Sequence, residues 1–143
     1  MGLLKIGKPA VTVTSDVTVM DAIKSMEEAG VGAVVVVEDG DLKGMFTERD
    51  VMLRVVIPAK DPAQTLVADV MTSPVLTVSK ETTVDDALTT MWERHFRHLP
   101  VVDADGRVEG MVSIRHLLHT KVENLTQELD SLEAYMTADG IGG

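Results

Sequence analysis

The sequence predicts an α/β (α+β) protein built from two tandem copies of one unit, each with the order strand, helix, strand, strand, helix. The copies are expected to pack about a pseudo-twofold axis through a shared core, followed by a long C-terminal helix. The main observation is an internal repeat. Residues 12–26 recur in related form at 77–91, and, after one inserted residue, Gly44 matches Gly110 and Arg49 matches Arg115. A single one-residue shift inside a turn is typical of duplicated structure.

One helix of each copy is predicted from the spacing of apolar residues. Apolar side chains recur at the spacing of one helix face over 19–26 and again over 84–91. Thr18 and Thr83 precede these stretches, and each is followed three residues later by an aspartate. This pattern is typical of a helix N-terminal cap, so both helices are expected to begin just after these threonines.

The strands are predicted from short apolar runs, which are rich in β-branched residues and typical of buried strands. An Asp-Gly pair after each run favours a hairpin, and a second short strand follows the pair. Runs, turns and second strands lie at 34–37, 39–40 and 42–46 in the first copy, and at 99–102, 105–106 and 108–112 in the second. A further helix is expected to begin after Thr47 in one copy and after Ser113 in the other.

The domain organisation follows from the repeat. Residues 1–57 form repeat 1, the proline-containing segment 58–68 forms a linker, residues 69–119 form repeat 2, and residues 120–143 form a helical extension with a frayed end. About 50 residues cannot bury such a sheet alone, so the two repeats are expected to pack on each other.

The C-terminal extension carries a heptad-like row of apolar residues over about two and a half heptads. We expect one long helix that packs on a partner subunit, and the alternative that it folds back on its own chain stays open. The row consists of Leu118, Val122, Leu125, Leu129, Leu132 and Met136.

Composition excludes several classes of function. The formal net charge is −10, which argues against a nucleic-acid partner because that affinity rests on basic residues. Apolar runs are too short to span a membrane, and the first residues lack the apolar stretch of a signal peptide. The chain has no cysteine, so disulfides and thiolate chemistry are excluded. A cytoplasmic location is the expectation.

The segment from Gly44 to Asp50 is the candidate binding motif, at a predicted strand-to-helix turn. Gly44 permits close approach of a ligand, and the helix N-terminus that follows suits a phosphate. Thr47 supplies a hydroxyl, Asp50 has two acceptor oxygens for a ribose diol, and Arg49 can face a phosphate. Thr47 and Asp50 also have the spacing of an ordinary helix-capping pair, so a purely structural role is the alternative.

The repeat and this motif resemble the CBS domain family, and two copies in tandem resemble a Bateman module. Residues 69–72 and 99–103 are also typical, and the likeness covers roughly residues 5–120. The resemblance implies that Thr47 and Asp50 bind the ribose and phosphate of an adenosine ligand. It also implies a site shared between the repeats, to which repeat 2 contributes Met71, Pro74, Val75, Phe96, Arg97 and His98.

A second, weaker site is implied at the matching motif of repeat 2. Its members are Ser113, Arg115 and His116, with Val31 and Gly32 from repeat 1. His116 replaces the aspartate, and a neutral imidazole cannot hold a diol as a carboxylate does. This site is therefore expected to be empty, weaker or suited to phosphate.

The resulting prediction is a sensor of adenine nucleotides, with AMP, ADP or ATP favoured and NAD or S-adenosylmethionine as further adenosine ligands. The family implies a disc-like homodimer that signals through a separate, unknown effector protein. No cofactor is expected to be required, and no nucleic-acid polymer or membrane is expected as a partner. The alternative is a structural dimerisation module whose sites no longer bind.

Catalysis and metal binding are not expected. The sequence has no nucleophile elbow, no phosphate loop with its lysine, and no isolated pair of carboxylates. The histidines form two pairs with a spacing of three, His95 with His98 and His116 with His119. This spacing can place two metal ligands on one side of a helix, but no third ligand is marked, so partly exposed histidines are the preferred interpretation.

Overall fold

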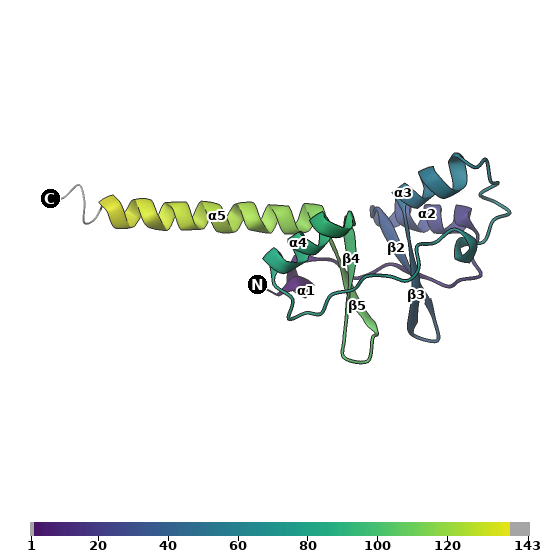
Figure 1. Cartoon of the computed structure of the whole chain (residues 1–143), viewed down its shortest axis with the longest axis horizontal. Coiled ribbons are helices and arrows are strands. Elements are labelled where there is room, and N and C mark those ends of the chain that lie inside the picture. The colour runs from purple at the N-terminus through teal and green to yellow at the C-terminus, as the bar shows by residue number, and fades with distance from the viewer. Residues whose placement is uncertain (1, 138–143) are drawn as a thin grey trace.

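The computed structural model describes residues 2–137 and has two sheets side by side, with a long helix projecting from one end (Figure 1). The helices α2 (Val19–Ala29) and α4 (Val84–Arg94) lie on opposite outer sides of the pair of sheets, and both hairpin turns point downward in this view. Residues 138–143, for which a frayed end is predicted, lie outside the described residues.

Repeat 1 has the predicted order of elements. The strands β1 (Thr12–Val13), β2 (Ala33–Glu38) and β3 (Asp41–Thr47) form one sheet in the order β1-β2-β3. The first pair is parallel and the second antiparallel. A short helix α3 (Glu48–Asp50) follows β3 and continues as a π-helical turn over Val51–Val56, labelled η1.

Repeat 2 keeps this order except at its first strand. The strands β4 (His98–Val102) and β5 (Val108–Ser113) form an antiparallel pair. The predicted first strand is reduced to one parallel bridge between Val78 and Val101, at the position that matches the β1–β2 pair. Pro100 explains the difference. In repeat 1 the N–H of Val35 donates to Val11, whereas Pro100 occupies the matching place and has no N–H.

The predicted caps and turns are present. Thr18 and Thr83 accept hydrogen bonds from the backbone N–H groups three residues on, and the helices begin directly after them. The turn between β2 and β3 is made by Asp39 and Gly40, with φ values of 51° and 82°. Two consecutive positive φ values are those of the tight hairpin turn that an Asp-Gly pair favours.

The core has one cluster in each repeat and one between them. The cluster between the repeats holds Ala33, Val35 and Met45 from repeat 1 with Met111 from repeat 2. These side chains come from the strands of both sheets, so the two repeats share a core as predicted. In each repeat's own cluster the helix packs through its apolar face, for example Val19 and Ala22 of α2.

The opening segments of the repeats are exchanged across this junction. Lys8 pairs with Met111 of β5, with backbone hydrogen bonds of 3.0 and 2.9 Å, and the preceding helix α1 (Leu3–Ile6) buries Leu3 in the core of repeat 2. In the same way, Thr72 pairs with Met45 of β3 through bonds of 2.8 and 3.0 Å. Each repeat therefore holds the start of the other.

The linker packs on repeat 1. Its backbone accepts from the start of α2, with Thr65 O 2.8 Å from Val19 N. A 3-10 turn, Val67–Asp69 (labelled η2), then buries Val67 in the core of repeat 1, and Val70 follows it there.

The C-terminal helix α5 (Ile114–Met136) leaves the body and does not fold back on it (Figure 1). Leu117 is buried in the core of repeat 2, and Lys121 forms a 2.9 Å ion pair with Asp85 of α4. Every residue from 122 to 136 is exposed. Among the described residues, no helix combines the length and the apolar character that crossing a membrane requires.

Candidate functional site

Asp50 lies where repeat 1 meets the opening segment of repeat 2. Only 6% of its surface is exposed, and it is the one charged residue buried among those that the structure describes. The hydroxyl of Thr72 donates to both carboxylate oxygens of Asp50, at 3.0 and 3.2 Å. A hydroxyl of repeat 2 therefore binds the carboxylate of repeat 1. Such a hydrogen bond offsets the cost of burying the charge, which would otherwise be unfavourable.

Asp50 also caps the helix that it begins. Its carboxylate accepts from the N–H of Thr47 at 3.1 Å, and the Thr47 hydroxyl accepts from the N–H of Asp50 at 3.2 Å. This reciprocal arrangement is a capping box, so the structural role that the spacing allowed is present. A structural role and a ligand role can coexist, because a carboxylate offers about four acceptor positions.

Two residues that the sequence reasoning missed complete the surroundings of Asp50. The Arg54 guanidinium lies 3.5 Å from Asp50 and donates to the carbonyl of Met71 at 2.8 Å. Arg54 follows Asp50 by one helical turn, and Thr72 closes a segment already noted as typical, so both had a signal in the sequence. Arg49, the predicted phosphate contact, is exposed and makes no ion pair in the described chain.

Gly44 has a packing role in this structure. A β-carbon at this position would lie 2.9 Å from Met71 Cγ and 3.0 Å from the Thr72 carbonyl oxygen, closer than real contacts allow. The missing side chain therefore makes room for the opening segment of repeat 2. The close approach predicted at Gly44 exists, and its partner here is the protein's own backbone and Met71.

The predicted contributors from repeat 2 differ in burial and in what they contact. Val75 packs against the core between the repeats, and Phe96 packs against the core of repeat 2, so the ring is half-buried in its own repeat. Pro74 and Arg97 are exposed. Met71, beside Gly44, and His98, at the start of β4 beside Glu48, are the members that reach the motif of repeat 1.

His98 meets Glu48, the residue after Thr47, against the backbone of Gly32. A β-carbon at Gly32 would lie 2.9 Å from Glu48 Oε1 and 3.3 Å from His98 Cε1. Gly32, a predicted member of the second site, lies beside His98, a predicted member of the first, so the two predicted sites adjoin. Burial lowers the pKa of His98 from its ordinary value, the nearby Glu48 carboxylate raises it, and His116 and Arg97 lower it.

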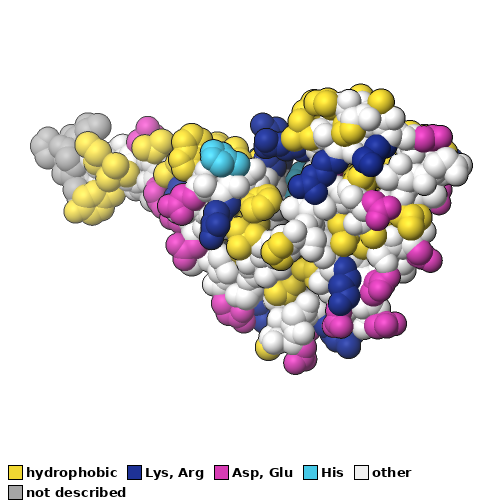
Figure 2. Space-filling view, turned by 45° about the vertical axis from the view of Figure 1, so that its right-hand side comes forward, with side chains coloured by type: hydrophobic (Ala, Val, Ile, Leu, Met, Phe, Trp, Pro, Cys, Tyr) yellow, Lys and Arg dark blue, Asp and Glu magenta, His cyan; other side chains and the backbone are white. Residues whose placement is uncertain are grey.

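Basic groups surround this junction despite the acidity of the whole chain. The charge of Arg97 lowers the pKa of His98, and the charges of Lys8 and Arg115 lower the pKa of His116. Figure 2 shows Lys and Arg side chains around the notch between the two halves of the body, with a histidine set into it. These basic side chains favour an anionic group in the notch.

The second predicted site shows what the replacement of aspartate by histidine preserves. Nδ1 of His116 accepts from the N–H of Ser113 at 3.2 Å, and the Ser113 hydroxyl accepts from the N–H of His116 at 3.3 Å. This is the same capping box as in repeat 1, now at the start of α5. Burial, followed by Lys8 and Arg115, lowers the pKa of His116. Val31 packs against the core of repeat 1.

Only one of the two predicted histidine pairs, His116 with His119, lies within a helix. The helix α4 ends at Arg94, His95 has a left-handed backbone with φ of 61°, and His98 lies in β4. His119 on α5 lies 3.1 Å from Glu123. Within residues 2–137, no group of three histidine or acidic side chains has an arrangement that could hold a metal ion.

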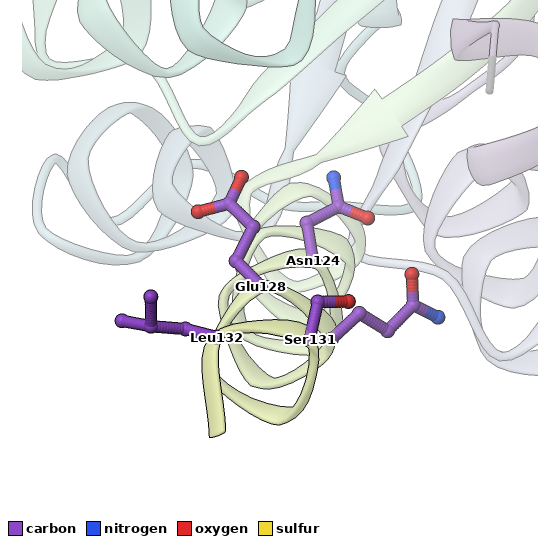
Figure 3. A pocket seen from close by; sticks show the side chains of 5 residues that line it. Asn124, Glu128, Ser131 and Leu132 are labelled. Atoms are coloured by element: carbon purple, nitrogen blue, oxygen red, sulfur yellow. The ribbon is translucent and has the colours of Figure 1, made fainter. Parts of the chain in front are cut away.

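Two surface hollows of the described chain lie away from Asp50. One is lined by Asn124, Gln127, Glu128, Ser131 and Leu132, all from α5, and Figure 3 shows their side chains radiating from this single helix. Another lies in repeat 2 between the segment 77–82 and the β4–β5 turn. Neither of these two hollows includes a predicted site residue.

The chain belongs to the CBS domain family. The model of the CBS domain matches twice, over residues 6–57 and 67–123, so the protein is a tandem CBS pair. It is similar to the mitochondrial CBS domain-containing protein CBSX3 of Arabidopsis thaliana, with 39% identity over 128 residues. That match covers 86% of this chain and 62% of CBSX3, so the chain spans about three fifths of this relative. YhcV of Bacillus subtilis is 35% identical, and the match covers 79% of each chain.

Solved structures have the same fold. A CBS-domain protein from Burkholderia ambifaria MC40-6 has a TM-score of 0.80 and 35% identity, with 86% of this chain and 95% of that chain covered. The CBS domain pair of protein MJ0100, solved in complex with 5'-methylthioadenosine and S-adenosyl-L-methionine, has a TM-score of 0.76. It is 24% identical, with 84% of this chain and 98% of that one covered, so this likeness concerns the fold.

Proposed function

We propose that this CBS pair is a regulatory module that binds an adenosine ligand, with AMP, ADP or ATP favoured, at the junction of its repeats. The observation that carries the proposal is the buried Asp50 carboxylate, which belongs to repeat 1 and is hydrogen-bonded to Thr72 of repeat 2. A ligand that engages this carboxylate contacts both repeats at once.

The chemistry of the junction supports a ribose-phosphate ligand. Asp50 supplies acceptors for a diol. The basic groups Arg97, beside His98, and Lys8 and Arg115, beside His116, favour an anion between the repeats. The adenosine compounds in the MJ0100 CBS pair support the same ligand class, since that protein shares the fold. In this account Met71 and Thr72 move aside when the ligand enters, which couples binding to the packing of the repeats.

The output is regulatory and reaches a separate effector protein. A ligand shifts a conformational equilibrium only through a difference in affinity for the two states. The exchanged opening segments link the ligand site to the rest of the fold. A displacement of Thr72 is transmitted to β3 through its backbone hydrogen bonds with Met45, so the two conformations would differ in affinity for the ligand. The proposal includes a cytoplasmic location and no catalytic step.

The module is also proposed to form a disc-like homodimer through the helices of its repeats. Met52 and Val56 on η1 and Ile57 directly after it are 53–69% exposed, and Trp92 on α4 is 82% exposed. These apolar side chains lie on surfaces that the chain itself leaves uncovered, and a second copy would bury them.

Isothermal titration with AMP, ADP, ATP, NAD and S-adenosylmethionine tests the ligand proposal. The informative variant is Asp50→Asn, which keeps an acceptor for the cap and for Thr72 but removes the charge. Asp86→Asn is the matched control, because Asp86 occupies the same place in the cap of α4 and is exposed. We expect the best ligand to lose at least tenfold in affinity with Asp50→Asn and to be unaffected by Asp86→Asn.

The opposite results are equally clear. If no adenosine ligand binds protein that has been freed of co-purified nucleotide, the alternative of a non-binding dimerisation module replaces the sensor. If a ligand binds equally well to both variants, its site does not involve Asp50.

A further inference from the structure

The outer part of α5 presents an uncovered apolar row, here called the α5 seam. All of its members are between 45% and 61% exposed, and they are Leu118, Val122, Leu125, Leu129, Leu132 and Met136. Contiguous apolar surface of this kind on a soluble domain marks an interaction site more often than isolated exposed residues do.

The helix needs a partner for physical reasons. Its contacts with the body end near Lys121, which pairs with Asp85, and residues 122–136 are exposed on all sides. An isolated helix of roughly 15 residues is marginal in water, because nucleation is costly and propagation gains little per residue. A row of leucines with heptad spacing supplies the missing stabilisation when it packs on another helix.

The charges of α5 are separated along its length. The basic residues Arg115 and Lys121 lie in its first third, and every charge after them is acidic, namely Glu123, Glu128, Asp130 and Glu133. Two such helices side by side in parallel would bring their acidic halves together. In the antiparallel arrangement the basic start of each helix lies beside the acidic end of the other.

The residues that flank the seam favour the same direction. With the seam at the core positions of a heptad, Glu128 and Glu133 occupy flanking positions that face each other between parallel chains, which is repulsive. In the antiparallel register that places Leu118 opposite Met136, His119 faces Glu133 of the second copy at each end. One Glu128–Glu128 pair near the centre then replaces the two Glu128–Glu133 pairs of the parallel arrangement, so fewer like charges meet. Like charges across a helix interface are unfavourable, and opposite charges fix the orientation.

From these observations we propose that the α5 seam binds the α5 helix of a second copy of this chain, in antiparallel orientation. The contact is isologous, because the same surface is used by both copies. It is separate from the repeat surfaces proposed for the disc-like dimer and does not depend on adenosine binding. With both contacts present in a closed assembly, four copies associate, and with the α5 contact alone, two.

Cysteine cross-linking tests the orientation directly, because the natural sequence has no cysteine. In the antiparallel pair, Leu118→Cys on one chain lies opposite Met136→Cys on the other. The two Leu118 positions of such a pair are about 27 Å apart, at 1.5 Å per residue along the helices. A disulfide is therefore expected when the two single variants are mixed, and not when either is oxidised alone. Disulfide formation by Leu118→Cys alone overturns the antiparallel arrangement.

The mass in solution, from light scattering, tests whether the seam is an interface at all. Leu125→Glu with Leu129→Glu places charges at the centre of the seam, and Gln127→Glu with Ser131→Glu adds the same charge off the seam. We expect the first pair to halve the mass and the second pair to leave it unchanged. Circular dichroism at the same concentration verifies that the body stays folded.

The opposing result is an unchanged mass in all of these variants, or a monomeric parent chain. Either result means that the seam binds another protein or remains exposed, and it overturns the proposal. Adenosine binding is measured on the same samples, so failure of the α5 contact and failure of the ligand proposal are distinguished.

Discussion

At the scale of single residues, the two repeats cap the helix after their second hairpin strand with different side chains. Thr47 with Asp50, and Ser113 with His116, form reciprocal capping boxes at matching positions. The carboxylate in repeat 1 is additionally bonded to Thr72, whereas the imidazole in repeat 2 accepts only from Ser113 among these groups. The histidine therefore keeps the cap but loses the acceptor that repeat 1 shares with its neighbour.

Asp50→Ala is expected to destabilise the fold by about 1–3 kcal/mol, the cost of leaving partly buried donors without an acceptor. The donors are the Thr72 hydroxyl and the Thr47 N–H. Asp50→Asn retains an acceptor and should cost less. Urea unfolding monitored by circular dichroism measures both, and equal stability of Asp50→Ala and the parent chain would contradict this role.

The histidines of the junction make stability depend on pH. Burial lowers the folded-state pKa of His98 and of His116 below the ordinary value of 6.5. As the pH falls through 6.5, the unfolded chain takes up protons that the folded chain does not, so the free energy of unfolding decreases. This contribution is fully present above pH 6.5 and is lost between 6.5 and the lowered values.

Protonation also removes the acceptor at Nδ1 of His116, which loosens the start of α5. Urea unfolding at a series of pH values between 7.5 and 5 should show falling stability, with a smaller fall in His116→Asn, since an amide oxygen keeps the cap and does not titrate. A slope that neither His98→Asn nor His116→Asn changes would refute this explanation.

At the scale of elements, the exchange of opening segments is the feature that joins the repeats. Thr72 adds to β3, and Lys8 adds to β5, through pairs of backbone bonds. Glycines make room for both segments. At Gly110 a β-carbon would lie 3.1 Å from Leu4 Cδ2, a looser contact than the one at Gly44.

Gly44→Ala is therefore expected to destabilise the chain by about 1–3 kcal/mol, the usual cost of overpacking, and by more than Gly110→Ala. Met71→Ala in the Gly44→Ala background should recover part of the loss, because Met71 is the side chain that fills the space. The midpoints of thermal unfolding of the four proteins measure this coupling. Additive effects of the two substitutions would show that Met71 does not occupy the space at Gly44.

The elements were predictable where the signal is local. The spacing of Val19 and Ala22 and the threonine caps defined the helices, and Asp39 with Gly40 defined a hairpin. The reduced first strand of repeat 2 was missed, because it depends on Pro100 facing a strand that lies more than twenty residues earlier. Thr72 was missed for a related reason, since its bond to Asp50 joins the two repeats and depends on how the segments cross. Arg54 was missed although it follows Asp50 by one helical turn.

At the scale of the whole molecule, one junction joins the two repeats and one helix leaves them. The buried Asp50 carboxylate and the exchanged segments meet at this junction, so a ligand there would be sensed by both repeats. The repeat and the family resemblance were readable from the sequence. The position of α5 was not, because the apolar row is compatible with packing on its own chain or on another.

The most direct test of the central claim is the midpoint of thermal unfolding of the purified chain, measured against increasing concentrations of each adenosine ligand. A ligand that binds only the folded state stabilises it by about 2.7 kcal/mol at 100 times its dissociation constant. We predict such a rise for one ligand in the parent chain and in Asp86→Asn, and its loss in Asp50→Asn. A midpoint that no ligand raises, in protein shown to be free of bound nucleotide, would contradict the account.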